Sequence, residues 1–155
     1  MDRGALLSPC REYRYTLWRR WDETPMAMFV GLNPSTADET LDDPTIRRCV
    51  GFARSWGYGG LLMCNLFGLR ATDPAAMKAA IDPVGSLADQ TLLAEAQRAA
   101  VVVAAWGTHG AHLGRGAAVR RLLTPYRLHY LRLTKDGHPS HPLYLPASLT
   151  PTLWQ

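Results

Sequence analysis

The sequence predicts an α/β domain, built as a three-layer α/β/α sandwich around a central, mainly parallel sheet of four strands. Two observations support this prediction: short, continuous apolar runs recur along the chain, and amphipathic helical patterns lie between them. Such an alternation implies right-handed βαβ crossovers, which place helices on both faces of a sheet. We expect residues 1–155 to form a single domain, because this length is typical of one and no linker or repeat interrupts it.

Segments in which nearly every position is apolar are predicted as the strands of the parallel sheet. They are residues 26–32, 60–66, 100–106 and 128–133, of which the last is the least apolar. A further segment, residues 13–17, alternates polar and apolar side chains. Alternation of this kind is typical of a half-exposed strand, so we expect an antiparallel strand at the edge of the sheet.

Two helices are predicted from the same start signal, an aspartate N-cap followed by proline in the first turn. Asp43-Pro44 begins a helix whose apolar stripe runs to a stop at Gly57, and Asp82-Pro83 begins a second helix. A third helix is expected over residues 111–123, although two glycines within it lower its helix propensity.

Composition excludes several classes of protein. Hydrophobic residues make up 47% of the chain and charged residues 19%, so a disordered protein is excluded. No apolar run approaches the roughly 18 residues that a membrane span needs. The three cysteines, at positions 10, 49 and 64, fit no zinc or iron–sulfur spacing. We therefore expect a cytoplasmic protein without metal, cofactor or membrane partner.

Positive charge is concentrated in two segments of the chain. The formal net charge is +4, and eleven of the 17 basic residues lie in residues 3–20 or 115–135. We expect these segments to form folded basic surfaces, which are compatible with a polyanionic partner such as DNA.

Polar side chains follow each predicted parallel strand, where ligands of such sheets bind. The positions are residues 33–36, Asn65 with Phe67, residues 107–109 and residues 137–140. They provide amides, hydroxyls, an aromatic ring and imidazoles, but no cluster of carboxylates. This chemistry suits a neutral planar group with hydrogen-bond donors and acceptors, such as a nucleobase, and suits a metal ion poorly.

The same positions resemble the uracil-DNA glycosylase superfamily. The four similar motifs are Gly31-Leu-Asn-Pro-Ser35, the strand that ends in Asn65, Trp106-Gly-Thr-His109 and His138-Pro-Ser140. Residues 31–49 also resemble a bacterial domain family of unknown function. The superfamily resemblance implies a monofunctional DNA glycosylase, taken to be a monomer, that removes a deaminated or damaged base, uracil-like or hypoxanthine-like, by hydrolysis of the N-glycosidic bond.

The resemblance also assigns the catalytic residues. Asn33 corresponds to the residue that positions the attacking water, and an amide can orient water but cannot remove its proton. His138 corresponds to the histidine that faces a carbonyl oxygen of the base, where it could stabilise developing negative charge. Asp38 is expected to act as the general base, because the most active branch of the superfamily has Asp at the position where this chain has Asn33.

The remaining roles concern the base and the DNA. Asn65 is expected to pair with the uracil edge and Phe67 to stack on the extruded base. The other residues expected around the base are Gly31, Leu32 and Pro34. Those expected to contact DNA are Ser35, Ser140 and Gly107, together with Leu143 or Tyr144 as the wedge that fills the vacated stack.

Other interpretations stay open. The same fold could serve as a nucleic-acid or nucleotide-binding module without cleavage, or as a hydrolase of free nucleosides. Asn33-Pro34-Ser35 could be an ordinary turn, Asp43 and Asp82 are most simply helix caps, and His109 is more simply structural. His141 shows no obvious partner in the sequence and is interpreted as solvated.

Overall fold

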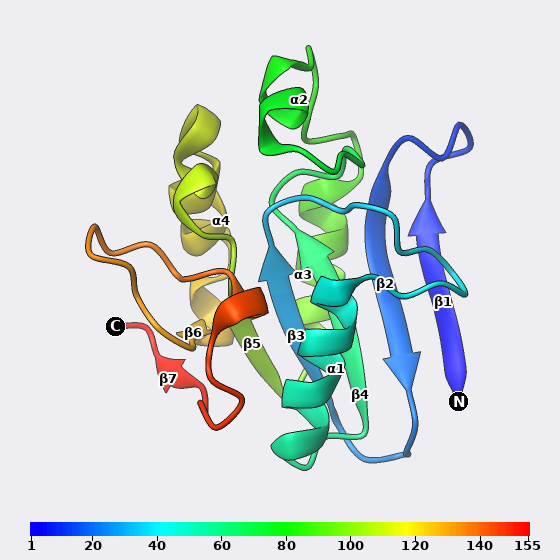
Figure 1. Ribbon diagram of the computed structural model, residues 1–155, viewed down its shortest axis with the longest axis vertical. Helices are drawn as coiled ribbons and strands as arrows, with labels where there is room; N and C mark the ends of the chain where they lie inside the picture. The colour runs from blue at the N-terminus through cyan, green and yellow to red at the C-terminus, as the bar shows by residue number, and fades with distance from the viewer.

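One seven-stranded sheet runs through the computed structural model, which describes residues 1–155 (Figure 1). Its strand order is β1-β2-β4-β3-β5-β6-β7. The strands are β1 (Asp2–Leu7), β2 (Arg14–Arg20), β3 (Met26–Gly31), β4 (Gly60–Asn65), β5 (Val101–Ala104), β6 (His129–Tyr130) and β7 (Thr152–Leu153). The prediction of an α/β protein is thereby confirmed.

The sheet is mixed, which corrects the prediction of a mainly parallel sheet of four strands. The four segments predicted as parallel strands do pair in parallel, in the order β4-β3-β5-β6. Antiparallel strands extend this centre on both sides, with β2 and β1 beside β4, and β7 beside β6. β1 and β7 were not predicted from the sequence, because β1 is partly exposed and β7 has only two residues.

The segment predicted as an edge strand is β2, and it lies inside the sheet between β1 and β4. Five of its seven residues are buried, including Arg14 and Arg19. The alternation in its sequence indicated one exposed face, but the buried arginines occupy positions where solvated residues were expected.

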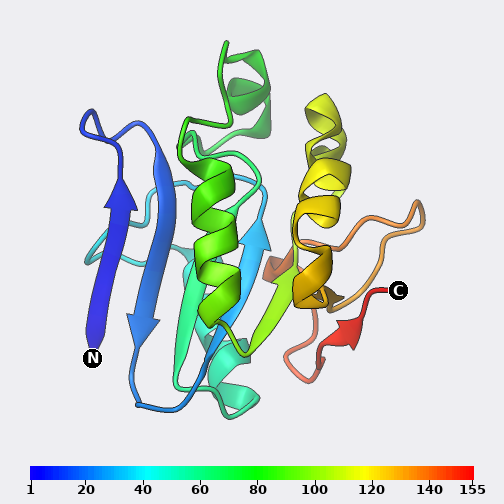
Figure 2. The ribbon, with the colours of Figure 1, turned by 180° about the vertical axis from the view of Figure 1, so that it is seen from behind.

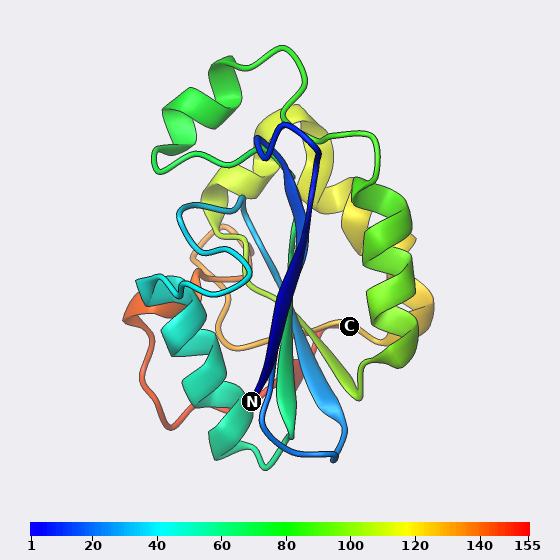
Figure 3. The ribbon, with the colours of Figure 1, turned by 90° about the vertical axis from the view of Figure 1, so that its right-hand side faces the viewer.

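Helices cover both faces of the sheet (Figure 3). α1 (Pro44–Ser55) packs on one face, and α3 (Ala88–Arg98) and α4 (Arg115–Leu122) lie side by side on the other (Figure 2). Each face has its own apolar core, centred on Phe29 and Phe52 under α1 and on Leu92 and Val119 under α3 and α4. None of the helices is long and apolar enough to cross a membrane.

The helix signals gave mixed results. The Asp43 cap is confirmed, since its carboxylate accepts a hydrogen bond from the Ile46 N–H at 2.9 Å. Asp82 instead caps a turn, because its carboxylate accepts from Val84 and Gly85, and α3 begins later. The unpredicted helix α2 (Pro74–Ala79) uses the same Asp-Pro signal.

The third predicted helix is broken. A 3-10 helix over Thr108–Gly114 precedes α4, and the two are separated where Leu113 (φ 56°) and Gly114 (φ 64°) adopt left-handed backbone. Two further 3-10 turns, Thr124–Tyr126 and Pro142–Tyr144, flank the C-terminal part of the sheet.

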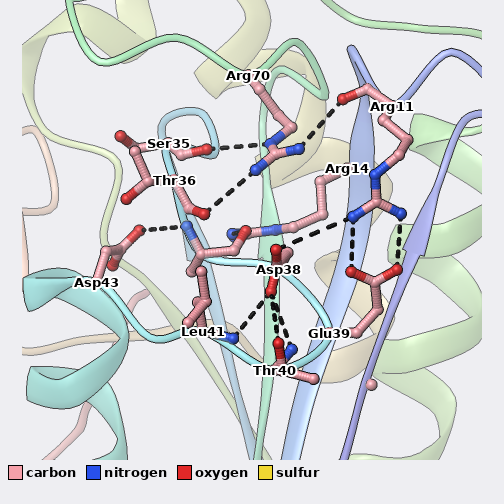
Figure 4. A network of polar contacts seen from close by, with 12 residues as sticks. Arg11, Arg14, Ser35, Thr36, Asp38, Glu39, Thr40, Leu41, Asp43 and Arg70 are labelled. Atoms are coloured by element: carbon pink, nitrogen blue, oxygen red, sulfur yellow. Dashed lines mark hydrogen bonds and ion pairs between the residues drawn. The ribbon is translucent and has the colours of Figure 1, made fainter.

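The loop between β3 and α1, residues 32–43, contains no helix or strand, and arginines fix its path (Figure 4). Arg19 is 1% exposed and donates to the carbonyl oxygens of Asp38 (2.7 Å) and Leu41 (3.0 Å), while its Nε pairs with Asp42 at 2.8 Å. Arg70 donates to the carbonyl oxygens of Ser35 and Thr36. The loop is therefore ordered mainly through its backbone.

Buried arginines also reduce the predicted basic surfaces. Arg14, Arg19 and Arg115 are at most 9% exposed. Arg115 donates to the Leu66 carbonyl oxygen and pairs with Asp89. Three of the eleven basic residues assigned to a DNA-facing surface thus belong to the interior.

We predict that the contacts of Asp38 and Glu39 stabilise this loop down to a lower pH than carboxyl groups with ordinary pKa values would. The N–H groups of Leu41 and Thr40 donate to the Asp38 carboxylate and hold its pKa below 3.8, its ordinary value. Arg11 pairs with Glu39 and lowers the pKa of that carboxyl from 4.5 to about 2. Both pKa values are depressed on folding, so this stabilisation is complete above the ordinary values and is lost as the pH falls toward about 2. The amide NMR resonances of Thr40 and Leu41 should titrate with a midpoint below 3.8; a midpoint at or above it would contradict this contact.

Candidate functional site

A cleft of about 430 Å³ lies beyond the carboxyl ends of the neighbouring parallel strands β3, β4 and β5. Its walls are the segment after β3, the first residues of α1, the loop after β4 and the segment after β5. His141 and Leu143 close it from the C-terminal part of the chain. The cleft therefore lies where ligands of parallel α/β sheets bind.

A smaller inner pocket of about 40 Å³ adjoins the cleft, with which it shares Asn33, Ser35, Asp43 and His141 among its lining residues. Its inner lining includes Arg14 from β2 and Asn65 from β4. This volume accommodates a few water molecules or the edge of a planar ring. The two cavities together form a narrow polar recess with a wider mouth.

Asn65 lies at the base of the inner pocket. It is 5% exposed, and its Nδ2 is buried without any hydrogen-bond acceptor. A Cβ at Gly31 on the adjacent strand would lie 2.7 Å from the Asn65 Oδ1, so the missing side chain of Gly31 makes room for this amide. An unpaired buried donor is costly unless a ligand or water accepts from it.

Asn33 has a fixed orientation. Its Nδ2 donates to the carbonyl oxygens of Ala71 (2.9 Å) and Pro34 (3.2 Å), and at longer range to that of Leu69. These contacts attach the loop after β4 to the end of β3. Because the NH₂ group is directed at carbonyl oxygens, Oδ1 is the part of the amide left to accept a hydrogen bond in the cleft.

His141 brings an imidazole to the cleft and the inner pocket. Its Nδ1 accepts from the Leu143 N–H at 3.3 Å, which leaves Nε2 as the proton-bearing nitrogen. Desolvation by the surrounding chain lowers the pKa of His141, although the negative charge of Asp43 opposes this shift. His141 is itself exposed at the cleft, and with Nδ1 accepting from Leu143 the neutral ring can donate one hydrogen bond from Nε2.

Asp43 is the one carboxylate that lines either cavity. It is 8% exposed, and its two oxygens accept from the N–H groups of Ile46 (2.9 Å) and Ala37 (3.3 Å). The residue interpreted as a helix cap is therefore both the cap of α1 and a wall of the pocket. No group of three or more His, Cys, Asp or Glu side chains is arranged to hold a metal ion.

The structure brings most of the residues expected at the site to these cavities. Gly31, Leu32, Asn33, Pro34, Ser35, Asn65, Gly107 and Leu143 all line the cleft, the inner pocket or both. Leu143 is half-buried, and the next residue, Tyr144, is 92% exposed.

His138 does not lie at the cleft. It lines a separate cavity of about 340 Å³ together with Trp106 and Trp154. The dipeptide His-Pro occurs twice, at residues 138–139 and 141–142, and the second occurrence faces the cleft. The first occurrence is the one that resembles the superfamily motif, because a serine follows it.

Three more candidates lie elsewhere. Asp38 contacts Thr40, Leu41 and Arg11 on the outer side of its loop. Phe67 is fully buried in the core below α4 and cannot stack on a ligand in this arrangement. Ser140 lines neither cavity, and its N–H donates to the Arg132 carbonyl oxygen.

Arg14 and His141 are the pocket residues that sequence reasoning missed. Arg14 was counted with a basic surface, and only the burial of β2 reveals its position. The repeated His-Pro pair was the available signal for His141.

Comparisons with known proteins agree with the second resemblance noted in the sequence. No curated protein and no solved structure matches the chain significantly. A family model covers residues 14–143, a range that includes β2, both cavities and His141. The chain therefore belongs to the family described as a protein of unknown function (DUF1643).

Proposed function

We propose that this protein is a DNA glycosylase that hydrolyses the N-glycosidic bond of a deaminated or damaged base, uracil-like or hypoxanthine-like, and that its fold is of the uracil-DNA glycosylase type. The observation that supports this most is the unpartnered amide of Asn65 at the base of a narrow polar recess. An amide offers a donor and an acceptor side by side, which matches the hydrogen-bonding edge of an oxo base. The target base would have to leave the duplex to reach it.

In this proposal Asn33 orients the attacking water. Its Oδ1 accepts a hydrogen bond from the water, while contacts to the backbone hold its Nδ2. The water oxygen bonds to C1′ of the sugar as the C1′–N bond breaks, and both electrons of that bond leave with the base. The water proton passes to solvent. The contribution of Asn33 is orientation, because an amide is not a base at pH 7.

His141 takes the role that the resemblance gave to His138. The neutral ring donates from Nε2 toward the base, where negative charge grows during bond cleavage. Ser35 and Gly107 line the cleft and are proposed to contact phosphates. Leu143, or the exposed Tyr144 beside it, is proposed as the wedge.

The test is a cleavage assay on oligonucleotides that contain uracil, hypoxanthine, xanthine or ethenocytosine, as single and double strands, with abasic sites as the readout. We expect product from at least one of them, and we expect Asn33→Ala to reduce the rate at least about 100-fold because it removes the oriented water. The variant also loses the contact with Ala71, so its fold is checked by circular dichroism. A lack of product from all four bases with folded wild-type protein would contradict the proposal.

A second candidate is a nucleic-acid or nucleotide-binding module without cleavage. One observation favours it: Asp43 is the one carboxylate at the cavities, and backbone N–H groups occupy both of its oxygens. No free general base is therefore present. This candidate predicts salt-dependent binding of DNA with no abasic product, which the same oligonucleotides would reveal.

A further inference from the structure

The guanidinium of Arg14 lines the inner pocket and is only partly paired. Arg14 is 2% exposed and donates from Nη1 to the Ala37 carbonyl oxygen at 3.0 Å. Its Nε is buried and has no acceptor. A buried cation normally pairs with a carboxylate or satisfies all of its donors, so this arrangement needs an explanation.

The one carboxylate that lines the inner pocket is already occupied. Asp43 lines the same pocket and raises the pKa of Arg14 by its charge, but its two oxygens accept from Ala37 and Ile46. Burial lowers the pKa of Arg14 to about 10, so the side chain is still positive at pH 7. The charges of Arg14 and Asp43 cancel. Because the Asp43 oxygens already accept hydrogen bonds, the pocket contains more free donors than free acceptors.

Asn65 adds a second unpaired donor to the same pocket. Its Nδ2 and the Nε of Arg14 are two of the five buried side-chain nitrogen or oxygen atoms of the protein that have no hydrogen-bond partner. They come from β4 and β2, which are neighbours in the sheet. Two unsatisfied donors in one recess are expected where a bound molecule supplies acceptors.

We propose that Arg14 and Asn65 form a donor pair that selects a neutral base carrying carbonyl oxygens on its buried edge. This inference rests on the proposed function and names its substrate class: oxo bases are accepted, and amino bases such as cytosine and adenine are rejected. An exocyclic amino group would place its own N–H against these donors, whereas a carbonyl oxygen accepts from them.

The same pair would assist the reaction. When the C1′–N bond breaks, its two electrons leave with the base, and the negative charge spreads onto the carbonyl oxygens. A guanidinium fixed beside that oxygen stabilises the anion more than the neutral base, which lowers the barrier without tight binding of the substrate. The released anion then takes a proton from solvent.

The test measures binding of free bases, so that it is independent of cleavage. Uracil and cytosine are titrated into the folded protein, with the ¹H–¹⁵N resonance of the Arg14 Nε as the direct probe. We expect uracil to shift this resonance and to bind at least about tenfold more tightly than cytosine. The amino group of cytosine would place a donor against the Arg14 donor, so the charge-assisted hydrogen bond that uracil accepts would be lost. Equal affinity for the two bases, or uracil binding that leaves the resonance unmoved, would overturn the inference.

Variants isolate the two donors. Arg14→Met removes the guanidinium at similar length, and Asn65→Leu removes the amide; each should weaken uracil binding at least about tenfold. If Arg14→Met does not fold, Asn65→Leu and the Arg14 Nε resonance of the wild-type protein carry the test. Arg132→Met is the matched control, because this exposed arginine makes no side-chain hydrogen bond and lies outside both cavities. Unchanged uracil affinity in folded Arg14→Met, or in folded Asn65→Leu, would contradict the inference.

The outcomes separate this inference from the proposed function. Uracil binding through Arg14 without cleavage of any oligonucleotide would keep the donor pair and reject the glycosylase. Cleavage without a preference for oxo bases would keep the glycosylase and reject the donor pair.

Discussion

Replacing His141 with Ala is expected to slow release of the base at least about 100-fold, the usual cost of removing one donor from a site of developing negative charge. His141 is the one imidazole that lines both the inner pocket and the cleft. The bond from the Leu143 N–H to its Nδ1 fixes the tautomer, so the proton on Nε2 is directed away from the backbone. The measurement is the single-turnover rate on the best oligonucleotide substrate.

His138→Ala is the matched control for this prediction. The two histidines are three positions apart, and each precedes a proline, but His138 lines the cavity beside Trp106 and Trp154. Its replacement should change the rate by less than about threefold, since it contacts neither the base nor Asn33 in the proposed mechanism. A larger loss from His138→Ala than from His141→Ala would reverse the assignment of the two residues.

Replacing Arg19 with Met is expected to lower the free energy of unfolding by about 3 kcal/mol, because hydrogen bonds to a buried charged group contribute more than neutral ones. Arg19 is 1% exposed, and its guanidinium bonds the carbonyl oxygens of Asp38 and Leu41 and the carboxylate of Asp42. Without it, three loop acceptors lose their partner. Urea denaturation followed by tryptophan fluorescence would measure the change.

Arg20→Met provides the control on the same strand. Arg20 is half-buried; it donates to the carbonyl oxygens of Asp22 and Glu23 in the next turn and forms an ion pair with the fully exposed Glu23 carboxylate. Its replacement should cost less than about 1 kcal/mol. Equal destabilisation by the two variants would mean that Arg19 contributes through the packing of β2 rather than through the loop.

Much of the fold could be predicted from the sequence because its signals are local. The apolar runs that became β3, β4 and β5 are continuous, and the Asp43 cap is read from two adjacent residues. Local signals fail where the conformation of a segment is determined by tertiary contacts. Asp82-Pro83 carries the same start signal as Asp43-Pro44, yet Gly85 takes up positive φ (88°) and ends the turn before a helix can form.

The site was predicted in part for the same reason. The positions after the parallel strands converge, as the topology requires, and Asn33, Asn65 and Gly107 meet at one recess. Nothing local distinguishes Arg14 from the other arginines of its segment, because its position depends on the loop between β3 and α1, where it binds the Ala37 carbonyl oxygen. The choice between His138 and His141 likewise depends on the path of a loop, which short motifs do not encode.

The arginines that hold the loop between β3 and α1 bind mostly to backbone carbonyl oxygens, which every residue has whatever its side chain. The exposed side chains of Thr36 and Thr40 therefore contribute little to the path of the loop beyond their backbone. Replacing Thr36, which lines the cleft, therefore leaves the bonds that Arg19 and Arg70 make to the loop backbone intact. The lining of the cleft can be redesigned at this position without redesign of the scaffold.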